Sequence, residues 1–249
     1  MSAIWAGCGG ERCIEPIEGT LCRMVESQEQ VATTEIVETL DEQAALEEML
    51  EASKPPLPTA GPRHYLLRTP FRYPPLRHGS RFGRRFEPSL FYASLAQPPM
   101  LAEAAFYRFV FWFGMATPPA STLTSQHTSF SARYRTARGV RLQAAPFDAY
   151  RTQLTDPADY GASQALGTAM RAAGVEAFEY VSARDPGRGL NVALFTPRAL
   201  VSSRPLRTDR WVCRTGAARV QFLNETSRAV FDFAVESFLV DGRLPQAAA

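Results

Sequence analysis

The chain has 249 residues, of which 45% are hydrophobic, so it is long enough to bury one sizeable core. Its formal net charge of +2 argues against a general polyanion binder, because such domains are usually strongly basic throughout. The four cysteines do not make a disulfide framework in a chain of this length, and their spacing is not that of a zinc site, so we expect no metal.

The N-terminal stretch MSAIWAGCGGER lacks the basic and apolar regions of a secretory signal. The most apolar run, residues 104–115, is too short to cross a bilayer and contains Arg108. We therefore expect a cytoplasmic protein that does not contact a membrane.

Acidic and basic residues separate along the chain. Residues 11–51 contain twelve acidic residues but only Arg12 and Arg23, whereas residues 63–141 contain twelve arginines and two carboxylates. We expect the acidic segment to dock on the basic part of the same chain. Contact with a second copy in a homo-oligomer, or with a partner protein, is the alternative.

Within the acidic segment, residues 26–52 predict a helix, because their apolar side chains follow an approximately helical spacing. The stretch KPPLPTAGP, residues 54–62, ends that helix and marks a boundary. We therefore divide the chain into a partly helical acidic segment with a Pro-rich linker, residues 1–62, and a main domain, residues 63–249.

After the linker, HYLLRTPF (residues 64–71) predicts a strand, and a long arginine-rich loop follows it. SLFYAS (residues 89–94) predicts a second short strand. Pro98 and Pro99 suit the first turn of a helix that extends to about Phe113.

Strands and helices mix in the rest of the chain without regular strand–helix–strand alternation, so we expect an α+β fold rather than a doubly wound sheet. The remaining expected elements are a strand pair at 121–134 and 139–147, a helix within 156–175, two strands around a turn within 176–197, a strand at 211–223 and a closing helix at 227–240.

Glu103 lies among apolar residues of a predicted helix, in LAEAAFYRF. Uncompensated burial of a carboxylate is costly, so Glu103 needs a partner, and a structural ion pair and a functional site explain it equally well. Tyr92 ends the strand before this helix, so both side chains can reach one cleft; a satisfied core tyrosine is the alternative. Ser182 lies before a predicted turn, where serines are common, and no G-x-S-x-G elbow surrounds it.

Five short motifs carry a resemblance to a known family: LLRTPFR, GSRFG, LFYAS, LAEAAFYRF and YVSARDPGRGLNVALF. In this order and spacing, the main domain resembles the RES-domain proteins, bacterial toxins of toxin–antitoxin pairs named for an arginine, a glutamate and a serine. Arg81 matches the arginine of the family's G-R-aromatic motif, Glu103 its helix glutamate and Ser182 its late serine. Tyr92 matches the strand tyrosine, and Arg68 resembles an earlier strand arginine.

One position departs from the family pattern. Many members have Trp-Asn after the motif arginine, whereas this chain has Phe82 and Gly83. The aromatic ring is kept, but any ligand contact by the amide side chain is lost.

The resemblance implies an ADP-ribosyltransferase-like fold, with a mixed β-sheet core and flanking helices. It also implies NAD⁺ as the substrate, destroyed by phosphorolysis or hydrolysis, with inorganic phosphate as a co-substrate in the first case and no bound cofactor. A mono-ADP-ribosyltransferase that modifies a protein, or a catalytically silent binding module, are the alternatives. Family members usually have an antitoxin partner with a helix-turn-helix domain, so DNA binding would belong to that partner and not to this chain.

Cleavage of the nicotinamide–ribose bond places positive charge on the anomeric carbon, which a fixed carboxylate stabilises. We therefore expect Glu103, Arg81 and Ser182 as catalytic residues, with Arg68 and Tyr92 binding the substrate and the arginines binding its pyrophosphate. The other arginines of the loop at residues 77–85 are expected at the surface.

Overall fold

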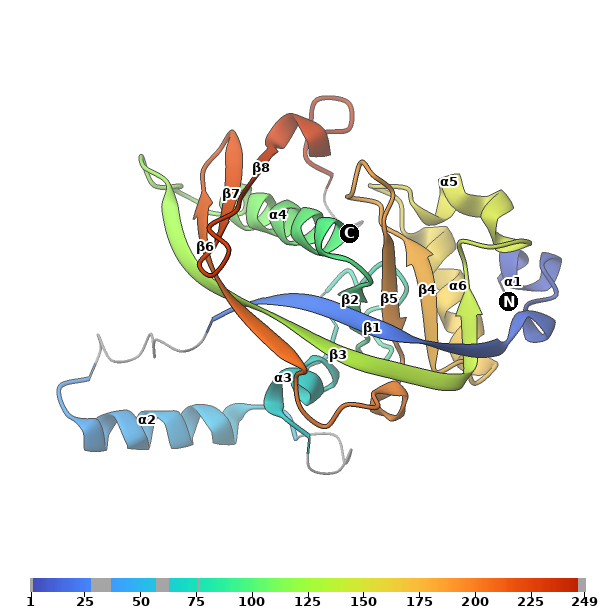
Figure 1. The fold of residues 1–249 in the computed structure, drawn as a ribbon, viewed down its shortest axis with the longest axis horizontal. Helices are drawn as coiled ribbons and strands as arrows, with labels where there is room; N and C mark the ends of the chain where they lie inside the picture. Colours follow the sequence, from blue (N-terminus) through green and yellow to red (C-terminus); the bar gives the residue numbers. More distant parts are fainter. Residues whose placement is uncertain (1, 28–36, 57–62, 76, 246–249) are drawn as a thin grey trace.

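The structure is a computed structural model that describes residues 2–27, 37–56, 63–75 and 77–245. Its described part contains one eight-stranded mixed sheet in the order β1-β2-β5-β4-β3-β6-β7-β8, with helices packed against it, which confirms the α+β class (Figure 1). The strands are β1 Glu15–Glu26, β2 Phe91–Ser94, β3 Leu123–Arg141, β4 Ala177–Val181, β5 Leu190–Leu194, β6 Arg207–Thr215, β7 Arg219–Asn224 and β8 Val230–Ala234.

Helices and helical turns connect these strands. None of the helices in the described ranges is long and apolar enough to cross a membrane. The α-helices are α1 Ala3–Gly7, α2 Leu40–Ser53, α3 Tyr65–Arg68, α4 Gln97–Phe113, α5 Arg151–Leu154 and α6 Gly161–Ala172, and the 3-10 turns are η1 Gly10–Cys13, η3 Thr69–Phe71, η4 Phe147–Tyr150, η5 Pro197–Ala199 and η6 Val235–Phe238.

Strand β1 pairs with both β2 and β3, so β1, β2, β5, β4 and β3 form a closed ring of strands. Strand β3 is the longest, with 19 residues, and it also continues to β6 on its other side. The sequence predicted a break between two strands in this region, which is wrong. Alternation of buried and exposed residues continues through Tyr134 and Thr136 because β1 pairs with β3 across the expected break.

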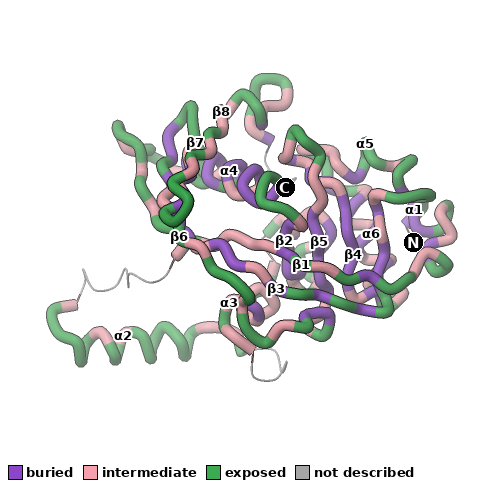
Figure 2. Tube along the Cα trace, viewed as in Figure 1, coloured by how far each residue is buried: buried purple, intermediate pink, exposed green. Residues whose placement is uncertain are grey.

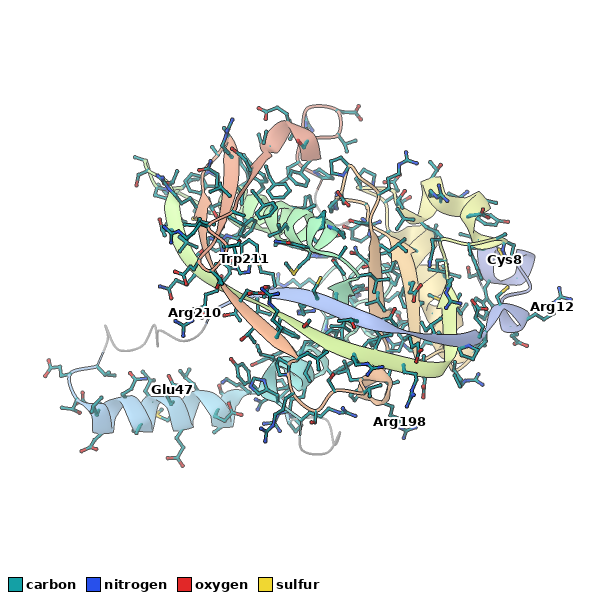
Figure 3. The ribbon with its side chains drawn as sticks, viewed as in Figure 1. Cys8, Arg12, Glu47, Arg198, Arg210 and Trp211 are labelled. Atoms are coloured by element: carbon teal, nitrogen blue, oxygen red, sulfur yellow. The ribbon has the colours of Figure 1, made fainter. Side chains whose placement is uncertain are left out.

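Helix α4 begins and ends close to its predicted bounds, with prolines in its first turn. One face packs on the sheet, where Phe106 and Phe109 join a core cluster with Trp211 and Phe222. Neighbouring residues of β6 point to opposite faces, so Trp211 is buried while Arg210 is exposed (Figure 3). Helix α6 packs on the other part of the sheet, in a cluster with Phe82 and Phe178.

Three other predicted elements are wrong. The single strand expected at 211–223 is instead the antiparallel pair β6 and β7, joined by a turn. Residues 64–71 form α3 and η3 rather than a strand, because His64 caps the turn through the Leu66 N–H and the buried Leu67 anchors it in the core. The predicted helix at 227–240 is instead β8 followed by a 3-10 turn. The sequence VFDFA has strand alternation, and β7 supplies the hydrogen-bonding partner for it.

Residues 2–26 take part in the same fold as the main domain. Helix α1 contributes Trp5 to a core cluster, and β1 pairs with β3 along most of its length, so the sheet crosses the border predicted at residue 62. The helix predicted from residue 26 begins at Leu40, and residues 28–36 lie outside the described residues. Helix α2 extends from the body with no buried residue (Figure 2), and Glu51 ties it to Arg72 at 2.7 Å.

Candidate active site

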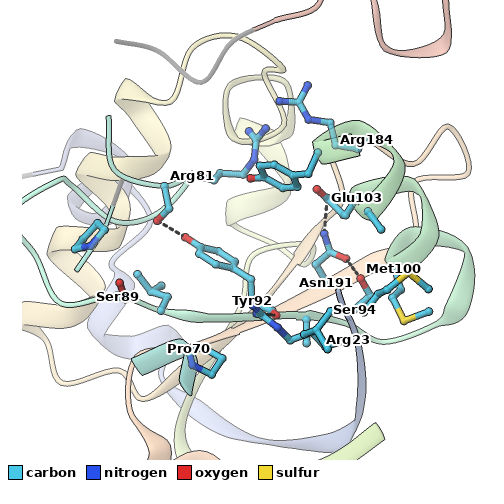
Figure 4. Close-up of a pocket in the computed structure, with 18 of the residues that line it drawn as sticks. Arg23, Pro70, Arg81, Ser89, Tyr92, Ser94, Met100, Glu103, Arg184 and Asn191 are labelled. Carbon is cyan, nitrogen blue, oxygen red and sulfur yellow. Dashed lines mark hydrogen bonds between the residues drawn. The ribbon is translucent and has the colours of Figure 1, made fainter. Parts of the chain in front are cut away.

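A cavity of about 580 Å³ opens between β1, β2, the loop before β2 and one face of α4 (Figure 4). Its size falls within the range usual for small-molecule sites, which is roughly 300–1,000 Å³. Arg81, Tyr92 and Glu103, which are separated in sequence, all line it. Ser182 and Arg68 are not among the lining residues, but Ser182 donates a hydrogen bond to Glu103.

The carboxylate of Glu103 is held by two neutral donors. Its Oε1 accepts the Ser182 hydroxyl at 2.7 Å and the Asn191 side-chain amide at 2.8 Å. Asn191 is itself fixed, because its Oδ1 accepts the Ser94 hydroxyl at 2.7 Å. Hydrogen bonds of this kind orient the carboxylate toward the cavity without cancelling its charge.

Ser182 is buried in the turn that follows β4. Its Oγ accepts the backbone N–H groups of Arg184 at 3.1 Å and Asp185 at 3.2 Å, so its own hydrogen is left to donate to Glu103. The sequence predicted Ser182 as a catalytic residue. The structure places its hydroxyl on the carboxylate, which is the position of a group that orients Glu103.

Tyr92 fixes the loop that carries Arg81. Its hydroxyl is 2.8 Å from the Ser80 hydroxyl and accepts the Phe82 N–H at 3.0 Å. Burial raises the pKa of Tyr92 to about 12, so the phenol is neutral at physiological pH. The loop closes tightly at Gly79, whose φ of +77° favours glycine.

Two guanidinium groups contact Tyr160, one over its ring and one at its hydroxyl. Arg81 donates to the carbonyl of Asp156 at 2.8 Å, and its guanidinium carbon lies 4.4 Å from the ring centroid. Arg184 donates to the Pro157 carbonyl at 2.8 Å and to the Tyr160 hydroxyl at 2.9 Å. Burial lowers the pKa of Arg184, although an arginine remains protonated at neutral pH.

A third guanidinium comes from the acidic N-terminal part of the chain. Arg23, on β1, donates to the Tyr92 carbonyl at 2.5 Å, and burial lowers its pKa to about 10. Its Nε is buried without a hydrogen-bond partner among the residues that the structure describes. The cavity therefore brings together one oriented carboxylate and several guanidinium groups, an arrangement suited to a ligand with phosphates and an electron-poor centre.

A comparison with models of protein families shows which family this chain belongs to. The model of the RES domain matches residues 56–214. This chain belongs to the RES-domain family. The match includes the expected site residues Arg68, Arg81, Tyr92, Glu103 and Ser182 of this RES-domain protein.

Among solved structures, a chain of the M. tuberculosis MbcT-MbcA toxin-antitoxin complex is similar to this RES-domain protein. The two share 10% identity with a TM-score of 0.49, over 83% of this chain and 91% of that chain. No curated protein matches the sequence.

Sequence reasoning missed several residues of this RES-domain site. Asn191 is a buried polar residue in the apolar strand LNVALF, which is the same signal that drew attention to Glu103. Arg184 lies in YVSARDPGRGLNVALF, one of the five motifs that carried the family resemblance. Arg23 had no such signal, because only the pairing of β1 in the sheet brings it to the cavity.

Proposed function

We propose that this RES-domain protein degrades NAD⁺ by cleaving the bond between nicotinamide and ribose. The observation that carries the proposal is the Glu103 carboxylate, held by Ser182 and Asn191 in the wall of a cavity that also contains Arg23 and Arg81. Such a cavity suits a substrate with a pyrophosphate and a sugar carbon that becomes positive during reaction.

In the proposed reaction, the bond from the anomeric carbon to the pyridinium nitrogen breaks, and its electron pair stays on that nitrogen. Nicotinamide therefore leaves as a neutral molecule, and positive charge develops on the ribose. The oriented carboxylate of Glu103 stabilises this charge where it forms. With water as the nucleophile, a new carbon–oxygen bond forms and the water proton passes to Glu103; with inorganic phosphate, an anionic oxygen forms the bond and no proton is transferred.

The guanidinium groups have two uses in this proposal. Arg81 and Arg184 hold the pyrophosphate through charge-assisted hydrogen bonds, and Arg23 adds positive charge on the side of β1. The same charge would attract inorganic phosphate as a co-substrate. Arg68 is not among the residues that line the cavity, so the pyrophosphate-binding role expected for Arg68 and Arg81 is proposed here for Arg81 and Arg184, with Arg23 adding positive charge.

We also propose that the protein acts as the toxin of a toxin–antitoxin pair in the cytoplasm, neutralised by a partner that carries the DNA-binding domain. Membership in the RES-domain family supports this proposal. Co-expression with the protein encoded beside it, followed by a growth measurement, tests it: restored growth and a stable complex are expected, and unchanged growth without complex formation would contradict it.

Incubation of the purified protein with NAD⁺ labelled in its adenylate half tests the reaction. We expect release of nicotinamide, with soluble ADP-ribose in phosphate-free buffer or ADP-ribose-1″-phosphate when phosphate is present. Label retained on protein would instead identify an ADP-ribosyltransferase. Absence of nicotinamide release under all conditions would leave a binding module and overturn the proposal.

Glu103→Gln is the decisive variant in this assay, because it keeps the shape of the side chain and removes its charge. We expect at least a roughly 100-fold loss of nicotinamide release, the usual cost of losing one electrostatic contact to the transition state. The variant should remain folded, as judged by thermal unfolding. Turnover at the parental rate would refute the role of Glu103.

A further inference from the structure

One face of α4 lines the cavity over several turns. The lining residues on this helix, from Glu103 through Tyr107 and Arg108 to Phe111, follow helical spacing. At 1.5 Å per residue, the eight steps from Glu103 to Phe111 cover about 12 Å. Strand β1 follows the same wall with residues 22–26, so the cavity has a second end at some distance from the catalytic carboxylate.

This second end, formed by Glu26, Arg108 and Phe111, has its own recognisable chemistry. The Arg108 Nη1 lies 3.2 Å from the Glu26 Oε2, and its Nε donates to the Thr215 hydroxyl at 3.0 Å. Its guanidinium carbon lies 4.8 Å from the centroid of the Phe111 ring. The arginine is buried behind its partners, whereas the Glu26 side chain is 62% exposed and Phe111 is half-exposed.

A neighbouring imidazole adds no positive charge to this end. His127 lines the cavity beside Arg108, and burial together with the Arg108 charge lowers its pKa to about 4. The groups that a ligand would meet here are therefore an aromatic ring and a carboxylate, with the one guanidinium engaged by Glu26 and Thr215.

Resting on the proposed function, we propose that this second end binds the adenosine half of the dinucleotide. The Phe111 ring stacks on the adenine, and Glu26 accepts hydrogen bonds from the hydroxyls of the adenosine ribose. A carboxylate in this role distinguishes a free 2′-hydroxyl from a 2′-phosphate, because the phosphate cannot donate and carries the same sign of charge. The site therefore selects NAD⁺ over NADP⁺.

Because Glu26 is paired with Arg108, Glu26→Gln should change the preference between NAD⁺ and NADP⁺ and not only the affinity for NAD⁺. Glu26→Gln removes the repelling charge and, in the same step, leaves Arg108 without its ionic partner. Arginine stays protonated and binds phosphate bidentately, so Arg108 becomes available to a 2′-phosphate. The kcat/KM for NADP⁺ should then rise, while that for NAD⁺ falls.

The first experiment measures kcat/KM for NAD⁺ and NADP⁺ with the wild-type protein and Glu26→Gln. Glu18→Gln is the matched control, because Glu18 is an exposed glutamate of the same strand that does not line the cavity. We expect a preference for NAD⁺ that falls by roughly 10- to 100-fold in Glu26→Gln, the usual range for one hydrogen bond to a charged group. The control should keep the wild-type ratio. Equal use of the two dinucleotides, or a ratio unchanged by Glu26→Gln, would overturn the inference.

A second pair of variants tests the aromatic contact. Phe111→Ala should raise the KM for NAD⁺ several-fold but leave that for nicotinamide mononucleotide unchanged, because the mononucleotide lacks the adenosine. Phe113→Ala is the control, since Phe113 is equally exposed on α4 and does not line the cavity. A similar KM increase for both substrates would contradict the placement of adenine at Phe111.

Binding of unreactive ligands separates this inference from the proposed function. Calorimetric titration with ADP-ribose and with its adenosine 2′-phosphorylated form requires no turnover. Tighter binding of ADP-ribose that depends on Glu26 supports the inference even if NAD⁺ is not cleaved, in which case the proposed function alone fails. Equal binding of the two ligands, or no binding of either, overturns the inference whatever the enzyme activity.

Discussion

Ser182→Ala tests whether the serine acts on the substrate or through Glu103. The substitution removes the 2.7 Å hydrogen bond to the carboxylate and leaves Asn191 as its remaining donor. A hydrogen bond to a charged group contributes about 1.5–3 kcal/mol. If Ser182 only orients Glu103, kcat should fall by roughly 10- to 100-fold with KM nearly unchanged.

The assay is nicotinamide release at saturating and limiting NAD⁺ for Ser182→Ala, Glu103→Gln and the double variant. Because both side chains act through one carboxylate, Ser182→Ala should cost little once Glu103 is replaced. Ser129→Ala is the matched control for the fold. Ser129 is a buried serine that accepts the Trp211 indole N–H at 2.9 Å, and it does not line the cavity. A raised KM with unchanged kcat, or full additivity in the double variant, would refute the orienting role and favour direct substrate binding.

Two further predictions concern the loop before β2 and the buried imidazole. Gly79→Ala should destabilise the fold by more than about 1–3 kcal/mol and raise the KM for NAD⁺, because a Cβ at φ +77° would also meet the Gly83 carbonyl oxygen at 2.3 Å. Gly242→Ala is the control, because Gly242 has a similar φ of +74° but an added Cβ would meet no atom within 4 Å, so only the backbone strain remains. Equal denaturation midpoints for the two variants would contradict the predicted clash with the Gly83 carbonyl. His127 should make the fold less stable as pH falls from 6.5 toward 4, because the unfolded chain binds a proton that the folded one, with its pKa of about 4, does not. The resulting loss in the free energy of unfolding is at most about 3 kcal/mol. Urea unfolding at pH 7 and pH 5 should therefore show a smaller difference in stability for His127→Gln than for the wild-type protein. The same difference in both proteins would be inconsistent with a buried neutral imidazole.

The sequence predicted those elements whose own residues specify them. Helix α4 has prolines in its first turn and an apolar face, and the β4–β5 hairpin has a turn at Asp185 between two apolar strands. Elements that depend on a partner were not predictable locally. Strand β1 mixes charged, small and apolar residues, and its pairing with β2 and β3 makes it part of the sheet.

The same distinction applies to the site. Glu103 was found because a carboxylate in an apolar helix needs an explanation, and Tyr92 because it ends the strand before that helix. Both side chains line one cavity. Arg68 was expected on a strand, but residues 64–71 form helical turns, and the side chain is not among those that line the cavity. Arg23 takes a place at the cavity through long-range strand pairing, which no local pattern reveals.

The charged groups in the two regions of the cavity differ in their partners. Arg81, Arg184 and Arg23 donate to backbone carbonyls, and Glu103 accepts from neutral donors, so these contacts fix each charge without neutralising it. A direct ion pair between Glu103 and one of these arginines would weaken both the field at the sugar carbon and the attraction for phosphate. At the other end, Arg108 is paired with Glu26 and its charge is compensated. Uncompensated charge therefore lies where the proposed bond cleavage and phosphate binding would require it, and compensated charge lies where the neutral nucleoside is proposed to bind.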